Sequence, residues 1–177
     1  MTLSDLASIG SLVSALAVLV SLGFLSLQMR QADKNQRASI RAARASRTVD
    51  LFLGATDPLV AEAVLKGMRG AADITETQVF QFTQFASARF FNAEDTFYQH
   101  REGLLNAYYL EGVTNGLRSS FAMPGMRGFY RRSRSVYGQA FAAFADTVLA
   151  ATPVVPDGGG TARFKADVAA ELAGTAG

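Results

Sequence analysis

The longest apolar stretch of the chain lies near its N-terminus. The run from Leu6 to Met29 holds 24 residues and no charged side chain. As an α-helix rising 1.5 Å per residue it would be about 36 Å long, enough to cross the ~30 Å hydrocarbon core of a bilayer with some tilt. The pattern therefore predicts a transmembrane anchor over residues 1–29.

Two alternatives produce such a run without a membrane span. One is the buried core helix of a soluble protein, but such helices are usually shorter and carry a polar stripe. The other is a cleaved signal peptide, but the residues before the run contain no Lys or Arg. The run also exceeds the apolar length of about 15 residues typical of signal peptides, and no small-x-small cleavage site follows it. We therefore favour a membrane span.

Helical periodicity continues beyond the anchor. Residues 24–53 contain no Pro or Gly, so the anchor is expected to continue without a break into a helix that ends at Gly54. Asp57 and Pro58 then fit a helix cap followed by proline in the first turn. The helices predicted after the anchor are 30–53, 58–67, 75–102, 104–122 and 126–150.

The third of these helices is rich in aromatic residues. Thr75 and Gln78 have capping-box spacing at its start, and Phe82 and Phe90 share one face, so both are predicted core residues. No strand-like alternation of any length occurs. The fold class is therefore expected to be all-α, with the anchor continuing into a four- to five-helix cytoplasmic bundle over 30–150. Prolines and glycines predict a linker and a weakly ordered tail over 151–177.

Charge is concentrated in two basic segments, one directly after the anchor and one at 127–134, while the stretch between them is acidic on balance. By the positive-inside rule the anchor is expected to leave its N-terminus in the periplasm and the bundle in the cytoplasm. If successive helices alternate in direction, both basic segments lie at the membrane end and contact anionic lipid. The predicted headgroup contacts are Arg30, Lys34, Arg37, Arg127, Arg131, Arg132 and Arg134.

Nucleic acid is the alternative partner for the second basic segment, because Tyr130 and Tyr137 accompany its arginines. In a membrane-anchored protein the lipid headgroups are the nearer source of phosphate, so no nucleic acid is expected. Small residues in the anchor also have the spacing that lets helices approach closely in lipid, although serine and glycine are tolerated in membrane helices without a partner. The predicted packing residues are Ala7, Gly10, Ser11, Ser14, Ala15, Ala17 and Ser21.

Candidate chemistry is sparse. The chain has no cysteine and one histidine, His100, and no Glu-x-x-His pair accompanies it, so neither a metal nor a cofactor is expected. Glu94 and Asp95 lie in an apolar helix, where pairing with Arg89 or Arg101 is a commoner explanation than catalysis. The glycine run before Thr161 lacks the Lys-Ser/Thr ending of a phosphate loop.

Several short segments resemble a group of uncharacterised bacterial membrane-anchored proteins over roughly residues 6–150. They are Leu27-Gln28-Met29-Arg30-Gln31, Arg37-Ala38-Ser39, Phe97-Tyr98-Gln99 before Gly103, and Pro124-Gly125-Met126-Arg127. Members often have a tryptophan in the last helix, where this chain has Phe129-Tyr130. The resemblance implies a topology with one anchor in the bacterial inner membrane, and it implies no activity.

The expected function is that of a non-enzymatic interaction or assembly protein held at the inner membrane, with a protein partner or self-association. The first alternative is a ligand-sensing bundle with an apolar pocket lined by Phe80, Phe85, Phe91 and Tyr98. The second is an enzyme that uses Glu94, Asp95 and His100, which would require the three polar groups to converge.

Overall fold

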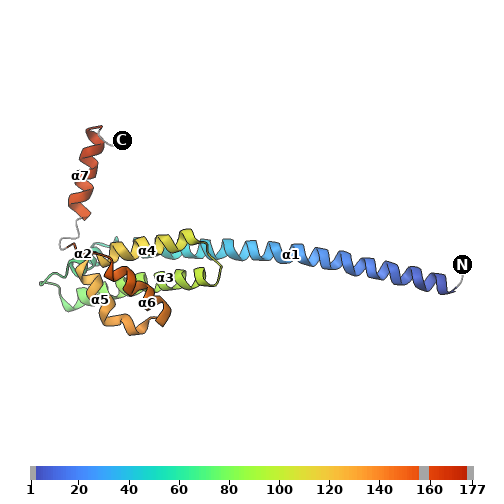
Figure 1. Cartoon of the computed structure of the whole chain (residues 1–177). Coiled ribbons are helices and arrows are strands. Elements are labelled where there is room, and N and C mark those ends of the chain that lie inside the picture. Colours follow the sequence, from blue (N-terminus) through green and yellow to red (C-terminus); the bar gives the residue numbers. More distant parts are fainter. Residues whose placement is uncertain (1–2, 156–159, 175–177) are drawn as a thin grey trace. The chain divides into compact units, whose positions relative to one another are not determined.

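The computed structural model describes residues 3–155 and 160–174. In this part of the chain every regular element is a helix (Figure 1), which confirms the all-α class. The elements are α1 (Leu3–Gly54), α2 (Pro58–Arg69), α3 (Glu76–Arg101), α4 (Ala107–Phe121), α5 (Pro124–Ser133), the 3-10 turn η1 (Arg134–Val136), α6 (Gln139–Ala150) and α7 (Gly160–Leu172).

The chain divides into two compact units, Met1–Arg44 and Ala45–Gly177. Helix α1 is uninterrupted across this boundary, so the predicted continuation of the anchor into the next helix is confirmed. In the first unit, all side chains from Ser8 to Gln36 are exposed. Among the described residues, α1 is the one helix long and apolar enough to cross a membrane.

The predicted starts of the next two helices are confirmed. The Asp57 carboxylate accepts hydrogen bonds from the amides of Leu59 and Val60 and so caps α2. At the start of α3, Thr75 and Gln78 form both bonds of the capping box. These bonds satisfy amide donors that have no partner inside the helix.

The second unit is built around α3. Phe82, Ala86, Phe90 and Phe97 are buried along one of its faces, as the sequence predicts for Phe82 and Phe90. They pack against apolar side chains of α4, α5 and α6. The remaining buried members of this core are Val113, Leu117, Phe121, Met126, Tyr130, Tyr137, Phe141, Ala145 and Val148.

The single helix predicted over 126–150 is wrong. The structure has two helices there, α5 and α6, separated by η1. Gly138 stands at the cap of α6, where a Cβ atom would collide with the Tyr98 hydroxyl. Val136, which falls within the predicted helix, lies in the turn and is 64% exposed.

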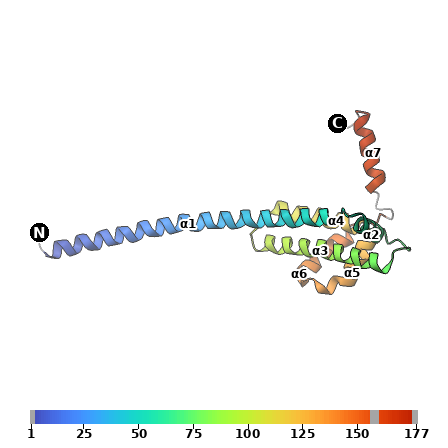
Figure 2. The same ribbon diagram turned by 180° about the vertical axis from the view of Figure 1, so that it is seen from behind.

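The predicted alternation of helix directions is also wrong. Arg47 and Thr48 of α1 contact Asp95 and Asn92 in the C-terminal half of α3, so α3 runs back toward the end of the body where α1 joins it. Helix α4 then runs away again (Figure 2), and α5 starts at the opposite end. The reason is that α2, with only 12 residues, is too short to run from one end of the body to the other. The reversal of chain direction expected of α2 is therefore made by α3.

The first residues of the predicted linker pack on the body. Thr152 is buried, and the amide of Val155 donates a hydrogen bond to the carbonyl of Ala122. Residues 156–159, which contain most of the glycine run, lie outside the described residues. Helix α7 beyond them has only exposed side chains.

Candidate functional site

Arg127, a predicted headgroup contact, is used inside the body. Its guanidinium donates hydrogen bonds to the carbonyls of Phe121 (3.2 Å), Leu149 (2.7 Å) and Thr152 (2.9 Å). These carbonyls stand at or just beyond the C-terminal ends of α4 and α6, where the helix dipole is negative and carbonyls lack partners within the helix. The side chain therefore joins two helix ends.

Arg134 is tied to α6. Its Nε lies 2.8 Å from one carboxylate oxygen of Asp146, and Asp146 also accepts from the buried hydroxyl of Tyr130 at 2.9 Å. The Arg134 guanidinium holds the pKa of Asp146 below its usual range. Burial, helped by the bond to Asp146, raises the pKa of Tyr130. The arrangement is a structural link between α5, η1 and α6.

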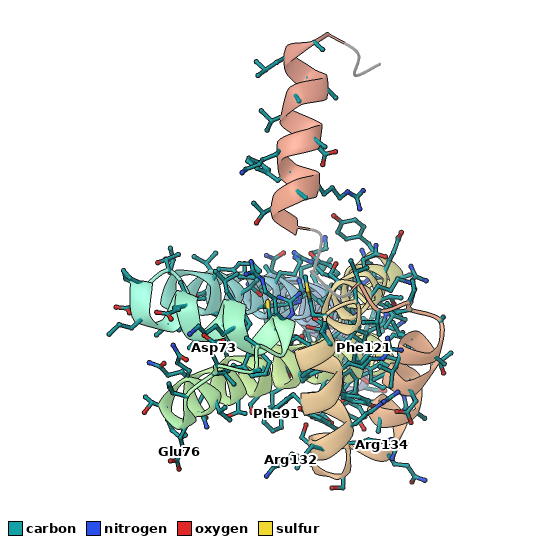
Figure 3. All side chains as sticks on the ribbon, turned by 90° about the vertical axis from the view of Figure 1, so that its left-hand side faces the viewer. Asp73, Glu76, Phe91, Phe121, Arg132 and Arg134 are labelled. Carbon is teal, nitrogen blue, oxygen red and sulfur yellow. The ribbon has the colours of Figure 1, made fainter. Side chains whose placement is uncertain are left out.

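Arg131 and Arg132 are exposed. Figure 3 shows Arg132 and Arg134 at the outside of the body. In the first unit Arg30 and Lys34 are exposed as well, whereas Arg37 forms an ion pair with Asp33 at 3.0 Å. Contact with lipid stays a prediction for all of these bases.

The structure separates the roles of these arginines in a testable way. We expect Arg127→Gln to lower the free energy of unfolding by about 1.5–3 kcal/mol, because three partly buried carbonyls lose a charged donor. Arg131→Gln, on the same helix but exposed, should change it by less than about 0.5 kcal/mol. Chemical denaturation of the full chain in mild detergent, followed by near-ultraviolet circular dichroism of the aromatic core, measures both. Equal effects of the two substitutions would contradict the assignment.

The three polar groups considered for catalysis have different partners. The Glu94 carboxylate accepts a hydrogen bond from the Gly138 amide at 2.7 Å. Asp95 forms an ion pair with Arg47 at 3.0 Å, so the expected pairing with Arg89 or Arg101 is wrong for this residue. His100 Nδ1 lies 3.1 Å from the carbonyl of Leu105. Each contact fixes a turn or a helix junction.

Arg89, which the sequence offered as a partner of Glu94 or Asp95, is a partly buried base that links two helices. Its Nε donates to the Ser120 hydroxyl at 2.7 Å, and an Nη lies 3.4 Å from the carbonyl of Gly116. Burial lowers the pKa of Arg89. The side chain links α3 to α4 through neutral acceptors, and only the three-dimensional packing brings these groups together.

The aromatic residues suggested for a ligand pocket do not share one. Phe85 is buried, whereas Phe80 and Phe91 are 64% and 47% exposed. Phe80 and Phe85 border an open groove with Leu51 of α1, while Phe91 borders a different groove. Tyr98 lies against Gly138. The four residues therefore do not line one enclosed pocket.

Two further features considered in the sequence are a metal site and the small residues of the anchor. In the described part of the chain, no group of three or more His, Cys, Asp or Glu side chains is arranged to hold a metal ion. Of the anchor's predicted packing residues, those from Gly10 to Ser21 are exposed on α1, and the side chain of Ala7 lies outside the described residues. The Ser21 hydroxyl donates to the Ala17 carbonyl at 2.8 Å.

The chain matches no family model, no curated protein and no solved structure. The resemblance to bacterial membrane-anchored proteins therefore remains an expectation, and the functional argument rests on the chain's own residues.

Proposed function

We propose that this protein is a single-pass protein of the bacterial inner membrane that presents a helical body in the cytoplasm as a non-enzymatic interaction or assembly module. The observation that carries the proposal is the apolar part of α1. Between Ile9 and Met29 its large apolar side chains are 48% to 70% exposed.

Leaving this helix in water would be costly. Burying one Leu, Val or Phe side chain contributes roughly 1.5–3 kcal/mol, so about ten of them contribute roughly 15–30 kcal/mol. A helix satisfies its own backbone polar groups, which a membrane interior requires. Two serine hydroxyls are also satisfied within the helix, since those of Ser8 and Ser21 donate hydrogen bonds to carbonyls one turn earlier.

The basic residues after Met29 support the orientation with the N-terminus in the periplasm and the body in the cytoplasm. Arg30 and Lys34 follow the apolar run directly and are exposed, which suits them to anionic headgroups at about 1 kcal/mol each. Arg131 and Arg132 are exposed too, but the alternation of helix directions that would bring them to the headgroups is wrong, so the proposal rests on Arg30 and Lys34. Arg127 and Arg134 are less suited, because their guanidinium groups already bind carbonyls and a carboxylate.

A role in protein contact, and not in catalysis, is supported by the body itself. Glu94, Asp95 and His100 are each engaged with a different partner. Phe80 and Phe91 are large apolar residues left on the surface, as in many protein-binding surfaces. This exposure favours a macromolecular partner over a ligand enclosed in a pocket.

The topology can be measured with single cysteines, because the chain has none of its own. In spheroplasts, which lack the outer membrane but keep the inner membrane intact, Thr2→Cys should react with a membrane-impermeant maleimide. Ser39→Cys should react only after the inner membrane is permeabilised. Deleting residues 6–29 should release the protein from alkali-washed membranes. The reverse labelling pattern, or a full-length protein found in the soluble fraction, would refute the proposal.

A further inference from the structure

Small residues recur at regular intervals along one line of the membrane segment. Gly10, Ser14, Ala17 and Ser21 follow one another at intervals of 4, 3 and 4, which is the 3.5-residue repeat of a coiled coil. All four are exposed on α1. Small residues at this spacing let two helix backbones approach closely in lipid.

The same line continues past the charged end of the membrane segment. The next positions in the repeat are Phe24, Gln28, Gln31 and Asn35, all exposed. Charged residues surround them in the sequence, yet none occupies the line. The Gln31 amide donates to the Asn35 side chain at 3.1 Å, so the two polar side chains lie along one strip of the helix.

The line then extends to the end of α1. Ala38, Ala42, Ala45, Val49 and Phe52 keep the intervals of 4 and 3. Val49 and Phe52 are each 52% exposed, so the line ends on two apolar side chains that are open to solvent. We call the whole line from Gly10 to Phe52 the seam. Every acid and base between residues 28 and 54 lies off it.

We infer that the seam is the contact surface of a parallel homodimer, in which α1 of one copy packs along α1 of a second copy. The inference rests on the proposed membrane anchoring, because two copies inserted in the same direction can only pair in parallel. In register, each seam residue then faces its own counterpart. A seam without charges is what such pairing requires, since like charges in direct opposition would repel.

The residues beside the seam fit the same arrangement. Lys34 and Arg41 flank it on one side, and in a parallel pair each faces the residue five positions later on the other helix. Those residues are Ser39 and Ser46, so no two bases oppose each other. Asn35 occupies the position at which a single buried asparagine specifies register and two-stranded pairing in coiled coils.

The contact is large enough for a stable pair. From Gly10 to Phe52 the seam is about 63 Å long at 1.5 Å per residue, and a helix is about 10 Å wide. A strip of these dimensions covers roughly 600 Å² on each copy, or roughly 1,200 Å² in total, which is at the lower limit of stable protein interfaces. Confinement to a membrane raises the effective concentration of the second copy.

The absence of native cysteine makes a matched test available. Ala42→Cys places a thiol on the seam, and Ala43→Cys places the same thiol one residue off it. Oxidation of inner-membrane vesicles that contain the full chain should convert Ala42→Cys into a disulfide dimer several-fold more efficiently than Ala43→Cys, because a disulfide needs Cβ atoms about 4 Å apart. Ala38→Cys should behave like Ala42→Cys.

Two readouts keep this inference distinguishable from the proposed function. If the protein is retained in alkali-washed membranes but Ala42→Cys and Ala43→Cys cross-link equally or not at all, the homodimer is overturned and the anchor stands. If the protein is absent from the membranes, the anchor and the pairing built on it both fail. Retention with cross-linking confined to seam positions is the result we expect.

Discussion

Replacing Phe90 with alanine is expected to lower the free energy of unfolding of the body by about 3–5 kcal/mol, the usual range for a buried phenylalanine. The side chain is 0% exposed. Its ring lies 5.4 Å from that of Tyr130, 5.7 Å from Phe121 and 5.9 Å from both Phe129 and Tyr137, centroid to centroid. Truncation would remove contacts with two other helices and the turn after α5, and would leave a cavity that a close-packed interior fills poorly.

The next residue supplies the control. Phe91 has the same side chain on the same helix but is 47% exposed and makes one edge contact, with Tyr137, so Phe91→Ala should cost clearly less, about 1–2 kcal/mol. Denaturant titration of the full chain in mild detergent, monitored by near-ultraviolet circular dichroism, reports the packing of the aromatic core. Losses of similar size at the two positions would mean that the face of α3 assigned to the core is wrong.

This pair of neighbours illustrates what the sequence could predict. Helical spacing identified the face of α3 that carries Phe82 and Phe90, because burial along one helix follows the 3.6-residue period. The same helix offered Phe80 and Phe91 as lining residues of an apolar pocket, but both are exposed. A count of aromatic residues around a helix does not show which other elements exist to cover them.

The loop region between α5 and α6 shows a different limit. Arg134-Ser135-Val136 contains no proline or glycine that would end a helix. The residues beside Gly138 do not mark it as the start of a new helix. The break is specified by contacts across the fold, in which the Glu94 carboxylate binds the Gly138 amide and Tyr98 occupies the space of a Cβ atom. The roles of Arg127 and Arg134 follow from the same break, since it brings α6 back beside α5. Local sequence could supply their charge but not their partners.

Gly125→Ala is expected to destabilise the body by about 3 kcal/mol or more, at or beyond the upper end of the usual cost of overpacking. Pro124 and Gly125 lie before the helix predicted to begin at residue 126, but both belong to the first turn of α5. A Cβ atom on Gly125 would overlap the carbonyl oxygen of Gly67 and would lie 2.8 Å from its carbonyl carbon. Helices α2 and α5 therefore meet backbone to backbone at this point.

The obstacle is main chain, which explains why the expected cost is high. A flexible side chain could rotate away, but Gly67 is buried in the last turn of α2 and its carbonyl cannot move without the helix. A Cβ atom on Gly67 itself would meet the ring of Phe82, so α2 is closely packed on two sides. An alanine at Gly125 must separate α5 from α2 and open the core beneath them.

Gly128→Ala provides the matched comparison, because it makes the same change one turn later in α5. No atom lies within 4 Å of the Cβ position there, and alanine is favoured over glycine inside a helix by up to about 1 kcal/mol. We therefore expect opposite signs: a large loss of stability for Gly125→Ala and a small gain or no change for Gly128→Ala. The measurement is the denaturation midpoint of each variant, compared with that of the parent chain. A Gly125→Ala protein as stable as the parent would show that α2 and α5 do not cross at Gly67 and Gly125.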